Sequence, residues 1–207
     1  MNPRIHPRPS RFPVTVLAGG LSQRMGFPKL KLAENQVPII NSMGERLISS
    51  GWTDLAIIIS DLQLKEFVKE FLPKAFIIVN HCPSDGMISS LRLGIAWAGE
   101  FEYSGVLAWP VDCPLVTETT LHYLRQAASS DNVVIPVYES QRGHPTWWGK
   151  SSWAALKSPS ADVGVKSIIH DGLVNVQEVM VNDPNILINI NTLEQARFYH
   201  LEEFAPR

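Results

Sequence analysis

The chain has 207 residues, of which 45% are hydrophobic and 18% are charged, a composition typical of a globular domain with its own core. Its formal net charge is −2, which excludes a general attraction to nucleic acid or to an anionic membrane, so phosphate binding would need a local site. Cys82 and Cys113 form no CxxC pair, which argues against a zinc knuckle or a disulfide scaffold and favours a reducing compartment.

The beginning of the chain is rich in proline and arginine. No apolar run follows these residues, so we interpret residues 1–12 as a flexible N-terminal arm and not as a signal peptide. No apolar run approaches the roughly 20 residues that a membrane span requires. No repeat or linker divides the remainder, so we expect a single domain over residues 13–207 in a cytoplasmic protein.

Short apolar runs alternate with helical patterns along most of the chain, which is typical of an α/β fold with a mostly parallel sheet. We expect strands over 14–17, 55–59, 76–79, 105–109 and 133–138, and helices over 38–50, 62–71, 87–98 and 117–128. The polar turn at 139–143 predicts that a strand around 146–148 pairs antiparallel with its neighbour.

The last third predicts helices near 151–156 and 163–170, strands over 174–181 and 186–190, and a helix that begins at Thr192. Trp147 and Trp148 should place one ring in the core and one on the outer face of their strand. The pattern as a whole predicts one Rossmann-like three-layer α/β/α sandwich whose sheet is mostly parallel with an antiparallel portion.

The strongest motif follows the first strand directly, over residues 17–29. Gly19 and Gly20 allow a tight turn that brings backbone N–H groups close to phosphate oxygens. Arg24 and Lys29 supply the positive charge that a triphosphate needs. The glycine spacing matches neither the Walker loop nor the G-x-G-x-x-G dinucleotide motif. The motif therefore predicts a different nucleotide-binding loop, with contacts from Gly19, Gly20, Arg24 and Lys29.

Three further positions carry candidate functional side chains. Asp112 follows the apolar run 106–109, so its carboxylate should emerge at the end of a strand, where it could bind Mg²⁺. Ser90 lies near the start of a predicted helix, where free N–H groups suit a phosphate or a base carbonyl, although packing is the alternative. His144 lies in a Gly-His-Pro turn between strands, which favours an acceptor-side or architectural role.

Residues 17–29 resemble the signature of the molybdenum-cofactor nucleotidyltransferases, a branch of the sugar-nucleotidyltransferase-like fold. The resemblance continues in family order through residues 85–95, 111–115, 142–145, 162–170 and 189–194. It implies catalytic roles for Arg24, Lys29 and Asp112, and nucleotide contacts from Leu17, Ala18 and Ser22 as well as from Gly19 and Gly20. It also implies that Asp112, Asn189 and Asn191 bind Mg²⁺, and that Gly143 and His144 lie near the acceptor.

The sequence departs from each branch of this family at particular positions. The cytidylyltransferase branch has acidic residues where this chain has Asn189 and Asn191. In this respect the chain resembles the guanylyltransferase branch, whose pattern there is N-x-N-T. The double glycine at 19–20 also favours the guanylyl branch, but the Gly-His-Pro motif at 143–145 favours the cytidylyl branch. Pro110-Val111 stands where the family often has glycine before the aspartate. The choice between CTP and GTP therefore stays open.

The resemblance implies a magnesium-dependent transfer of a nucleoside monophosphate from an NTP to a phosphorylated acceptor, with release of pyrophosphate. The acceptor phosphate is already ionised, so no side-chain nucleophile is required. The expected acceptor is molybdopterin that carries molybdenum, and a sugar-1-phosphate or another small phosphate is the alternative. A non-catalytic accessory protein that binds nucleotide or cofactor and hands molybdenum cofactor to a molybdoenzyme is a second class. An NAD-dependent reductase is disfavoured by the glycine spacing.

Overall fold

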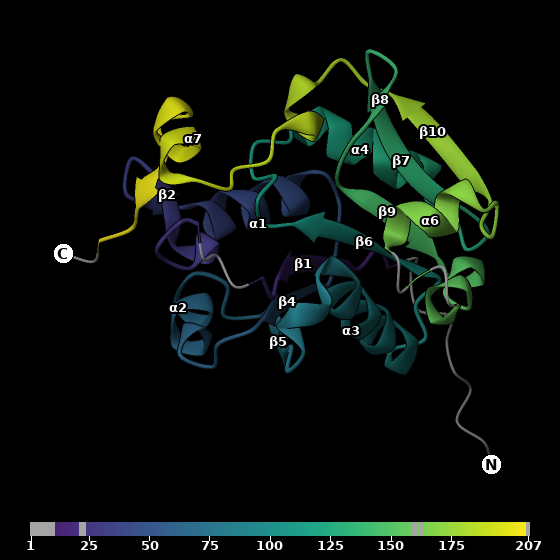
Figure 1. The fold of residues 1–207 in the computed structure, drawn as a ribbon, viewed down its shortest axis with the longest axis horizontal. Coiled ribbons are helices and arrows are strands. Elements are labelled where there is room, and N and C mark those ends of the chain that lie inside the picture. Colours follow the sequence, from purple (N-terminus) through teal and green to yellow (C-terminus); the bar gives the residue numbers. More distant parts are fainter. Residues whose placement is uncertain (1–10, 21–23, 159–160, 162–163, 206–207) are drawn as a thin grey trace.

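A computed structural model of the chain describes residues 11–20, 24–158, 161 and 164–205 (Figure 1). Its main sheet has eight strands in the order β10-β7-β9-β6-β1-β4-β5, with β8 paired to β7. The strands are β1 Val14–Ala18, β4 Leu55–Ile59, β5 Phe76–Val79, β6 Gly105–Pro110, β7 Val133–Tyr138, β8 Gln141–Arg142, β9 Thr146–Gly149 and β10 Val176–Met180. The predicted fold class is confirmed.

Most neighbouring strands of this sheet run parallel. Strand β1 pairs parallel with β4 and β6, β4 with β5, and β10 with β7. Strand β9 runs antiparallel to both β6 and β7, with Trp148 opposite Val106 on one side and Val133 on the other. The antiparallel portion that the turn at 139–143 predicts is therefore present, and β8 lies inside that turn.

Helices cover both faces of the sheet, which makes three layers. Side chains such as Val16 and Trp109 pack on one face with α1 Ile39–Ser49, α2 Leu64–Phe71 and α4 Glu118–Ala127. Side chains such as Leu17 and Ile58 pack on the other face with α3 Met87–Glu100 and α6 Val165–His170. Alternation along each strand explains this division, because successive residues point to opposite faces.

The two tryptophans of β9 follow the same alternation. Trp147 packs in the first cluster and Trp148 in the second, and both rings are buried. The expectation that one ring lies on an outer face was wrong, because the helices and short turns after β9 cover that face as well. The periodicity of a strand shows which face each residue points to, but not whether other elements cover that face.

Helix α3 approaches β1 closely. A Cβ atom on Gly94 would lie 2.6 Å from Cγ2 of Thr15, so only glycine allows this distance between the helix and the strand. The close approach brings the first turn of α3 next to the residues that follow β1. These are the two segments that form one side of the site described below.

The predicted strand at 186–190 is not present. Residues Pro184–Leu187 form a 3₁₀ turn, η5, because Pro184 begins it and the Asp183 carboxylate accepts a hydrogen bond from the Asn185 N–H at 3.1 Å. The segment then continues to Ile190, whose N–H donates to the Asp112 carbonyl at 2.7 Å. Residues 151–156 likewise form short 3₁₀ turns, η3 Lys150–Ser152 and η4 Ala155–Lys157.

A small three-stranded sheet, which the sequence patterns did not predict, lies beside the 3₁₀ turn η1 Lys29–Lys31. It consists of β2 Leu32–Glu34, β3 Val37–Pro38 and β11 Glu202–Glu203. Helix α7 Leu193–Phe198 precedes β11 and begins with a capping box formed by Thr192 and Gln195. These elements connect the end of the chain to the turn that carries Lys29.

The start of the described chain lies on the domain. The Phe12 ring packs against Trp52 and Trp147 at centroid distances of 6.0 and 6.2 Å. Arg11 lies 3.5 Å from the Asp54 carboxylate. Residues 1–10 of the arm predicted over 1–12 lie outside the described residues, and the domain boundaries stay a prediction. Among the residues that the structure describes, no helix has the length and apolar character needed to cross a membrane.

Candidate active site

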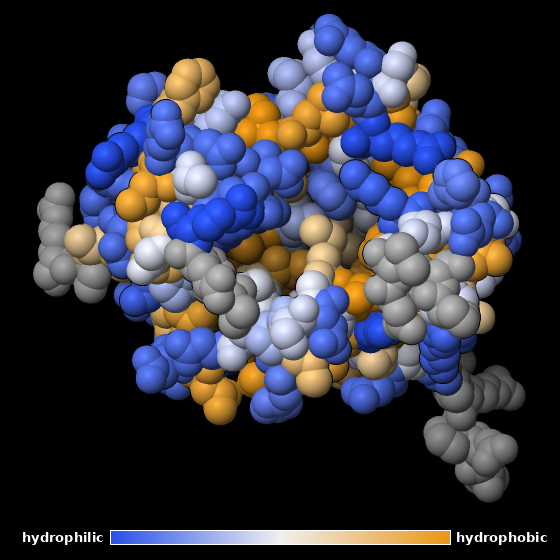
Figure 2. All heavy atoms as spheres, viewed as in Figure 1, coloured by the Kyte–Doolittle hydropathy of each residue, from blue (hydrophilic) through white to orange (hydrophobic). Residues whose placement is uncertain are grey.

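A cleft of about 190 Å³ lies at the carboxyl ends of β1 and β6, where an open α/β sheet typically binds ligands. Its lining comes from three segments: the turn after β1 with Lys29, the start of α3, and the turn after β6. The lining residues are Leu17, Ala18, Gly19, Gly20, Lys29, Pro83, Gly86, Met87, Ser90, Pro110, Val111 and Asp112. Figure 2 shows a hollow near the middle of the face of the molecule that it draws.

The predicted nucleotide loop forms much of this lining. Residues 17–20, Lys29 and Ser90 all line the cleft, as the sequence interpretation expects. Arg24 is exposed and lies outside the lining, so the structure does not bring it together with the other predicted residues. Ser22 lies outside the described residues. Backbone N–H groups near Gly19 and Gly20 and the Lys29 ammonium are donors suited to phosphate oxygens.

The side chains of Lys29, Asp112 and Asn191 meet at one end of the cleft. The Lys29 ammonium donates to Oδ2 of Asp112 at 3.3 Å and to Oδ1 of Asn191 at 2.7 Å. These residues come from η1, from the turn after β6 and from the segment before α7, so only the tertiary fold brings them together. Two oxygen atoms therefore converge on one positive charge.

Asn189 has a different environment. Its Oδ1 accepts a hydrogen bond from the Cys113 thiol at 3.0 Å. Burial, with a further contribution from Asp112, raises the pKa of the Cys113 thiol, which therefore stays protonated and remains a donor at neutral pH. The sequence interpretation gave Cys113 no role, because a single cysteine between Asp112 and Pro114 carries no pattern. The structure pairs it with a predicted metal ligand.

The chemistry of the donor set can be compared with the requirements of a magnesium ion. Oxygen atoms of Asp112 and Asn191 already surround a cation, the Lys29 ammonium, and oxygen is the donor that Mg²⁺ prefers. In the described parts of the chain, no group of three or more His, Cys, Asp or Glu residues is arranged to hold a metal. The site therefore fits an ion bound by one carboxylate, an amide oxygen and substrate phosphates, with Asp112 and Asn191 as the fitting ligands.

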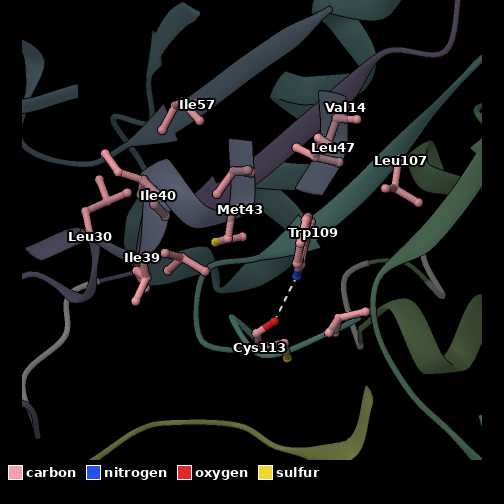
Figure 3. Packing of buried hydrophobic residues seen from close by; sticks show 14 of the residues in the cluster. Val14, Leu30, Ile39, Ile40, Met43, Leu47, Ile57, Leu107, Trp109 and Cys113 are labelled. Carbon is pink, nitrogen blue, oxygen red and sulfur yellow. Dashed lines mark hydrogen bonds between the residues drawn. The ribbon is translucent and has the colours of Figure 1, made fainter. Parts of the chain in front are cut away.

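Buried donors hold the turn that carries Asp112. Trp109 Nε1 donates to the Cys113 carbonyl at 2.9 Å, the bond drawn as a dashed line in Figure 3. The Arg46 guanidinium donates to the carbonyls of Pro114 and Val116, both at 2.6 Å, and its central carbon lies 5.7 Å from the centre of the Trp109 ring. Arg46 of helix α1 thus anchors the turn that carries Asp112.

Arg46 was missed because an arginine in an amphipathic helix usually faces solvent. Its position beside the buried residues Met43 and Leu47 is the one signal that could have indicated partial burial. Burial lowers the pKa of Arg46, and the nearby carboxylates of Glu34 and Asp183 oppose that effect. Asp183 was also missed, although its carboxylate ties the C-terminal segment to the start of α4.

Gly143 and His144, which the sequence predicts near the acceptor, are not among the residues that line the cleft. A Cβ atom on Gly143 would overlap the carbonyl oxygen of Ile186, and the His144 N–H donates to the same oxygen at 3.0 Å. The Nδ1 atom of His144 is buried and has no hydrogen-bond partner among the described residues. Burial lowers the pKa of His144, although the charge of Asp112 opposes this, so the imidazole is neutral at neutral pH.

Solved structures of other proteins resemble this fold. Rv0371c from Mycobacterium tuberculosis has a TM-score of 0.77 and 22% identity, over 92% of this chain and 98% of that one. The same protein is also known in complex with manganese. A nucleotidyl transferase from Methanothermobacter has a TM-score of 0.75 and 21% identity, over 93% and 97% of the two chains.

Molybdopterin-guanine dinucleotide biosynthesis protein A from Archaeoglobus fulgidus has a TM-score of 0.65 and 18% identity, over 91% of this chain and 97% of that one. These identities support the fold alone. No curated protein sequence matches the chain. The MobA-like NTP transferase domain, however, matches residues 14–178, which include the turn after β1, the start of α3 and Asp112. The chain therefore belongs to the MobA-like NTP transferase family.

Proposed function

We propose that this protein uses Mg²⁺ to transfer a nucleoside monophosphate from CTP or GTP to a phosphorylated small molecule, with release of pyrophosphate. The observation that carries the proposal is the meeting of Lys29, Asp112 and Asn191 at the end of a cleft lined by Gly19 and Gly20. This arrangement places a cation, hard oxygen ligands and a glycine turn around one small space. Those are the groups that phosphoryl and nucleotidyl transfer require.

The residues of the chain have separate tasks in this reaction. Backbone N–H groups of the turn at Gly19 and Gly20 bind triphosphate oxygens, and Lys29 places positive charge beside the leaving pyrophosphate. Asp112 and Asn191 would hold the magnesium ion, which when bound neutralises charge on the phosphates. Arg24 is proposed to approach the triphosphate from the exposed part of the same loop. The acceptor phosphate is the nucleophile, so no covalent enzyme intermediate forms.

Gly143 and His144 are proposed to lie on the acceptor side. The support is that the Nδ1 atom of the neutral His144 imidazole is buried without a partner among the described residues, and that the charge of Asp112 acts on this ring. Molybdopterin is the favoured acceptor, because a structural neighbour from Archaeoglobus fulgidus is a molybdopterin-guanine dinucleotide biosynthesis protein. A sugar-1-phosphate is the alternative within the same reaction class. The cytoplasm is the proposed compartment, in keeping with the two free thiols.

A second candidate function is supported by Asn189. Its oxygen accepts from the Cys113 thiol, whereas the Lys29 ammonium donates to Asp112 and Asn191, so among the described residues Asn189 lies apart from the two other predicted metal ligands. A protein with such a site could bind nucleotide or molybdenum cofactor without catalysis and pass the cofactor to a molybdoenzyme. This candidate predicts nucleotide binding without pyrophosphate release.

The test is pyrophosphate release from CTP, GTP, ATP and UTP with Mg²⁺, measured with and without molybdopterin or molybdenum cofactor as acceptor. We expect release with CTP or GTP that depends on the acceptor and stops when the metal is chelated. A parallel assay with sugar-1-phosphates tests the alternative acceptor. Binding of NTP without release in any mixture would favour the accessory function, and the absence of NTP binding would contradict both.

A further inference from the structure

Asn80 lies directly after β5 and is 2% exposed. Its backbone N–H donates to the carbonyl of Ile59 at 2.7 Å, which keeps it in register with the end of β4. Its side chain uses both ends of the amide: Oδ1 accepts from the Cys82 N–H at 2.9 Å, while Nδ2 donates to Ser89 Oγ at 2.8 Å and to Ser90 Oγ at 3.0 Å. Since only Oδ1 can accept from the Cys82 N–H, the orientation of the amide is fixed, with Nδ2 toward the serines.

The two serines differ in what remains available to a ligand. The Ser89 hydroxyl accepts from Asn80 and donates to the Gly86 carbonyl at 2.8 Å, so its hydrogen is already used inside the chain. The Ser90 hydroxyl also accepts from Asn80, but within the described part of the chain no acceptor takes its hydrogen. Ser90 lines the cleft, whereas Ser89 does not.

The contact with Gly19 places this hydroxyl beside the nucleotide loop. A Cβ atom on Gly19 would lie 2.5 Å from Ser90 Oγ and 3.1 Å from Asn80 Nδ2. Glycine at position 19 is therefore required by the Asn80–Ser90 pair as well as by the turn itself. The pair and the loop after β1 form one packed unit, so a change in the direction of the Ser90 O–H group alters the surface that the nucleotide meets.

We infer that Asn80 is a positioning residue for nucleotide recognition: it donates to one lone pair of the Ser90 hydroxyl and so directs the hydroxyl hydrogen toward an acceptor atom of the nucleobase or ribose. The inference rests on the proposed function. It assigns the hydroxyl hydrogen of Ser90 to this part of the cleft. A ligand group that accepts hydrogen bonds, such as a base carbonyl, satisfies that hydrogen.

The decisive variant is Asn80→Asp, which keeps the shape of the side chain and reverses its hydrogen-bonding role. The introduced carboxylate accepts from Ser90, so the hydroxyl hydrogen turns away from the cleft. Calorimetric titration should show binding of the preferred NTP weakened by about tenfold, the cost of one unsatisfied polar contact. Binding of inorganic tripolyphosphate, which has no base or ribose, should stay unchanged.

The serines supply matched variants that avoid a charge in a buried place. Ser90→Ala should weaken NTP binding by a similar factor, while Ser89→Ala should leave it unchanged although Ser89 contacts the same amide. Adding Asn80→Asp to Ser90→Ala should cause little further loss, because the first residue acts through the second. Fully additive losses, an equal loss for tripolyphosphate, or unchanged NTP binding by Ser90→Ala would overturn the inference. Absence of NTP binding by the unaltered protein would overturn the proposed function itself.

Discussion

The two sides of the cleft are built from different chemistry. One side, the charged corner, consists of Lys29, Asp112 and Asn191, whose side chains bind one another through ionic hydrogen bonds. The other side, the neutral wall, consists of Gly19, Ser90 and the amide of Asn80 behind them. Opposite charges in the corner can exchange partners when a substrate ion arrives, whereas the wall keeps fixed donors. We therefore propose that the corner binds ions and that the wall recognises the uncharged part of a nucleotide.

The largest effect is expected from Asp112→Asn in the charged corner. The variant keeps the shape of the side chain but removes the negative charge, and we expect turnover to fall roughly 10²- to 10³-fold. The unfolding temperature should change little, because the Lys29 ammonium keeps its hydrogen bond to Asn191 and the introduced amide oxygen can still accept from it. Pyrophosphate release and thermal unfolding measure the two quantities. Asp85→Asn, at an exposed position, is the control, and turnover within tenfold of normal would remove Asp112 from the site.

The next effect tests whether the corner depends on its buried support. Arg46→Met removes charged donors from the carbonyls of Pro114 and Val116, and we expect the free energy of unfolding to fall by about 2–3 kcal/mol. Urea denaturation measures this loss. Turnover should fall as well, because the turn that carries Asp112 loses its anchor. Arg197→Met, on the exposed side of α7, should be neutral, and equal stability of the two variants would contradict the role of Arg46.

A smaller effect should follow from Asp183, which accepts hydrogen bonds from the Thr117 N–H and hydroxyl and from the Thr120 hydroxyl at 2.8–2.9 Å. Burial by itself raises the pKa of Asp183. The hydrogen bonds from Thr117, Thr120 and Asn185 together lower it by more, so the pKa of Asp183 lies below its ordinary value. The carboxylate therefore stabilises the fold above its unfolded pKa of about 4, and this stability is lost as the pH falls through the lower folded pKa.

Asp183→Asn should lower the free energy of unfolding by roughly 1–2 kcal/mol at neutral pH. The difference between the variant and the unaltered protein should then narrow as the pH falls below about 4, because protonation removes the same charge from the unaltered protein. Urea denaturation at several pH values tests this. A difference that stays constant down to pH 3 would show that the charge of Asp183 is not the cause.

The smallest expected effect concerns metal binding by the charged corner. If Lys29 occupies the place of a metal ion, Lys29→Met should increase the affinity for Mn²⁺ in the absence of nucleotide by roughly tenfold, while turnover falls. Electron paramagnetic resonance of free and bound Mn²⁺ measures the affinity. Lys31→Met, in the same 3₁₀ turn, should leave it unchanged. Weaker metal binding by Lys29→Met would mean that the ammonium helps to organise the corner instead of competing for its oxygens.

The parts of the site that could be predicted are those in which one short segment carries the chemistry. Gly19, Gly20 and Lys29 lie in one segment, 19–29, after a clear apolar strand, and Asp112 follows another such strand. Asn80 is different, because an asparagine after a strand is as typical of an ordinary turn as of a positioning residue. Its role depends on contacts with a helix that begins later in the chain, and no local pattern encodes such contacts.

The elements of the fold also differ in how well the sequence predicts them. The strand 55–59 has a continuous apolar pattern, and its predicted bounds are those of β4. The strand expected at 186–190 has a similar apolar content, but Asp183 and Pro184 fold its beginning into a 3₁₀ turn. Strand β11, with the sequence Glu-Glu, has no strand pattern at all and forms only because β2 is available for pairing. Short elements that depend on a distant partner escape prediction.

The pairing of β11 with β2 also affects the order in which the protein matures during synthesis. Phe204 donates its N–H to the carbonyl of Lys31 at 2.7 Å, and its ring packs against Phe67 and Phe71. The ribosome therefore makes the loop that holds Lys29 early but supplies its last neighbours only with residues 202–204. A nascent chain can build the neutral wall before it completes the charged corner, which needs Asn191 and residues 202–204.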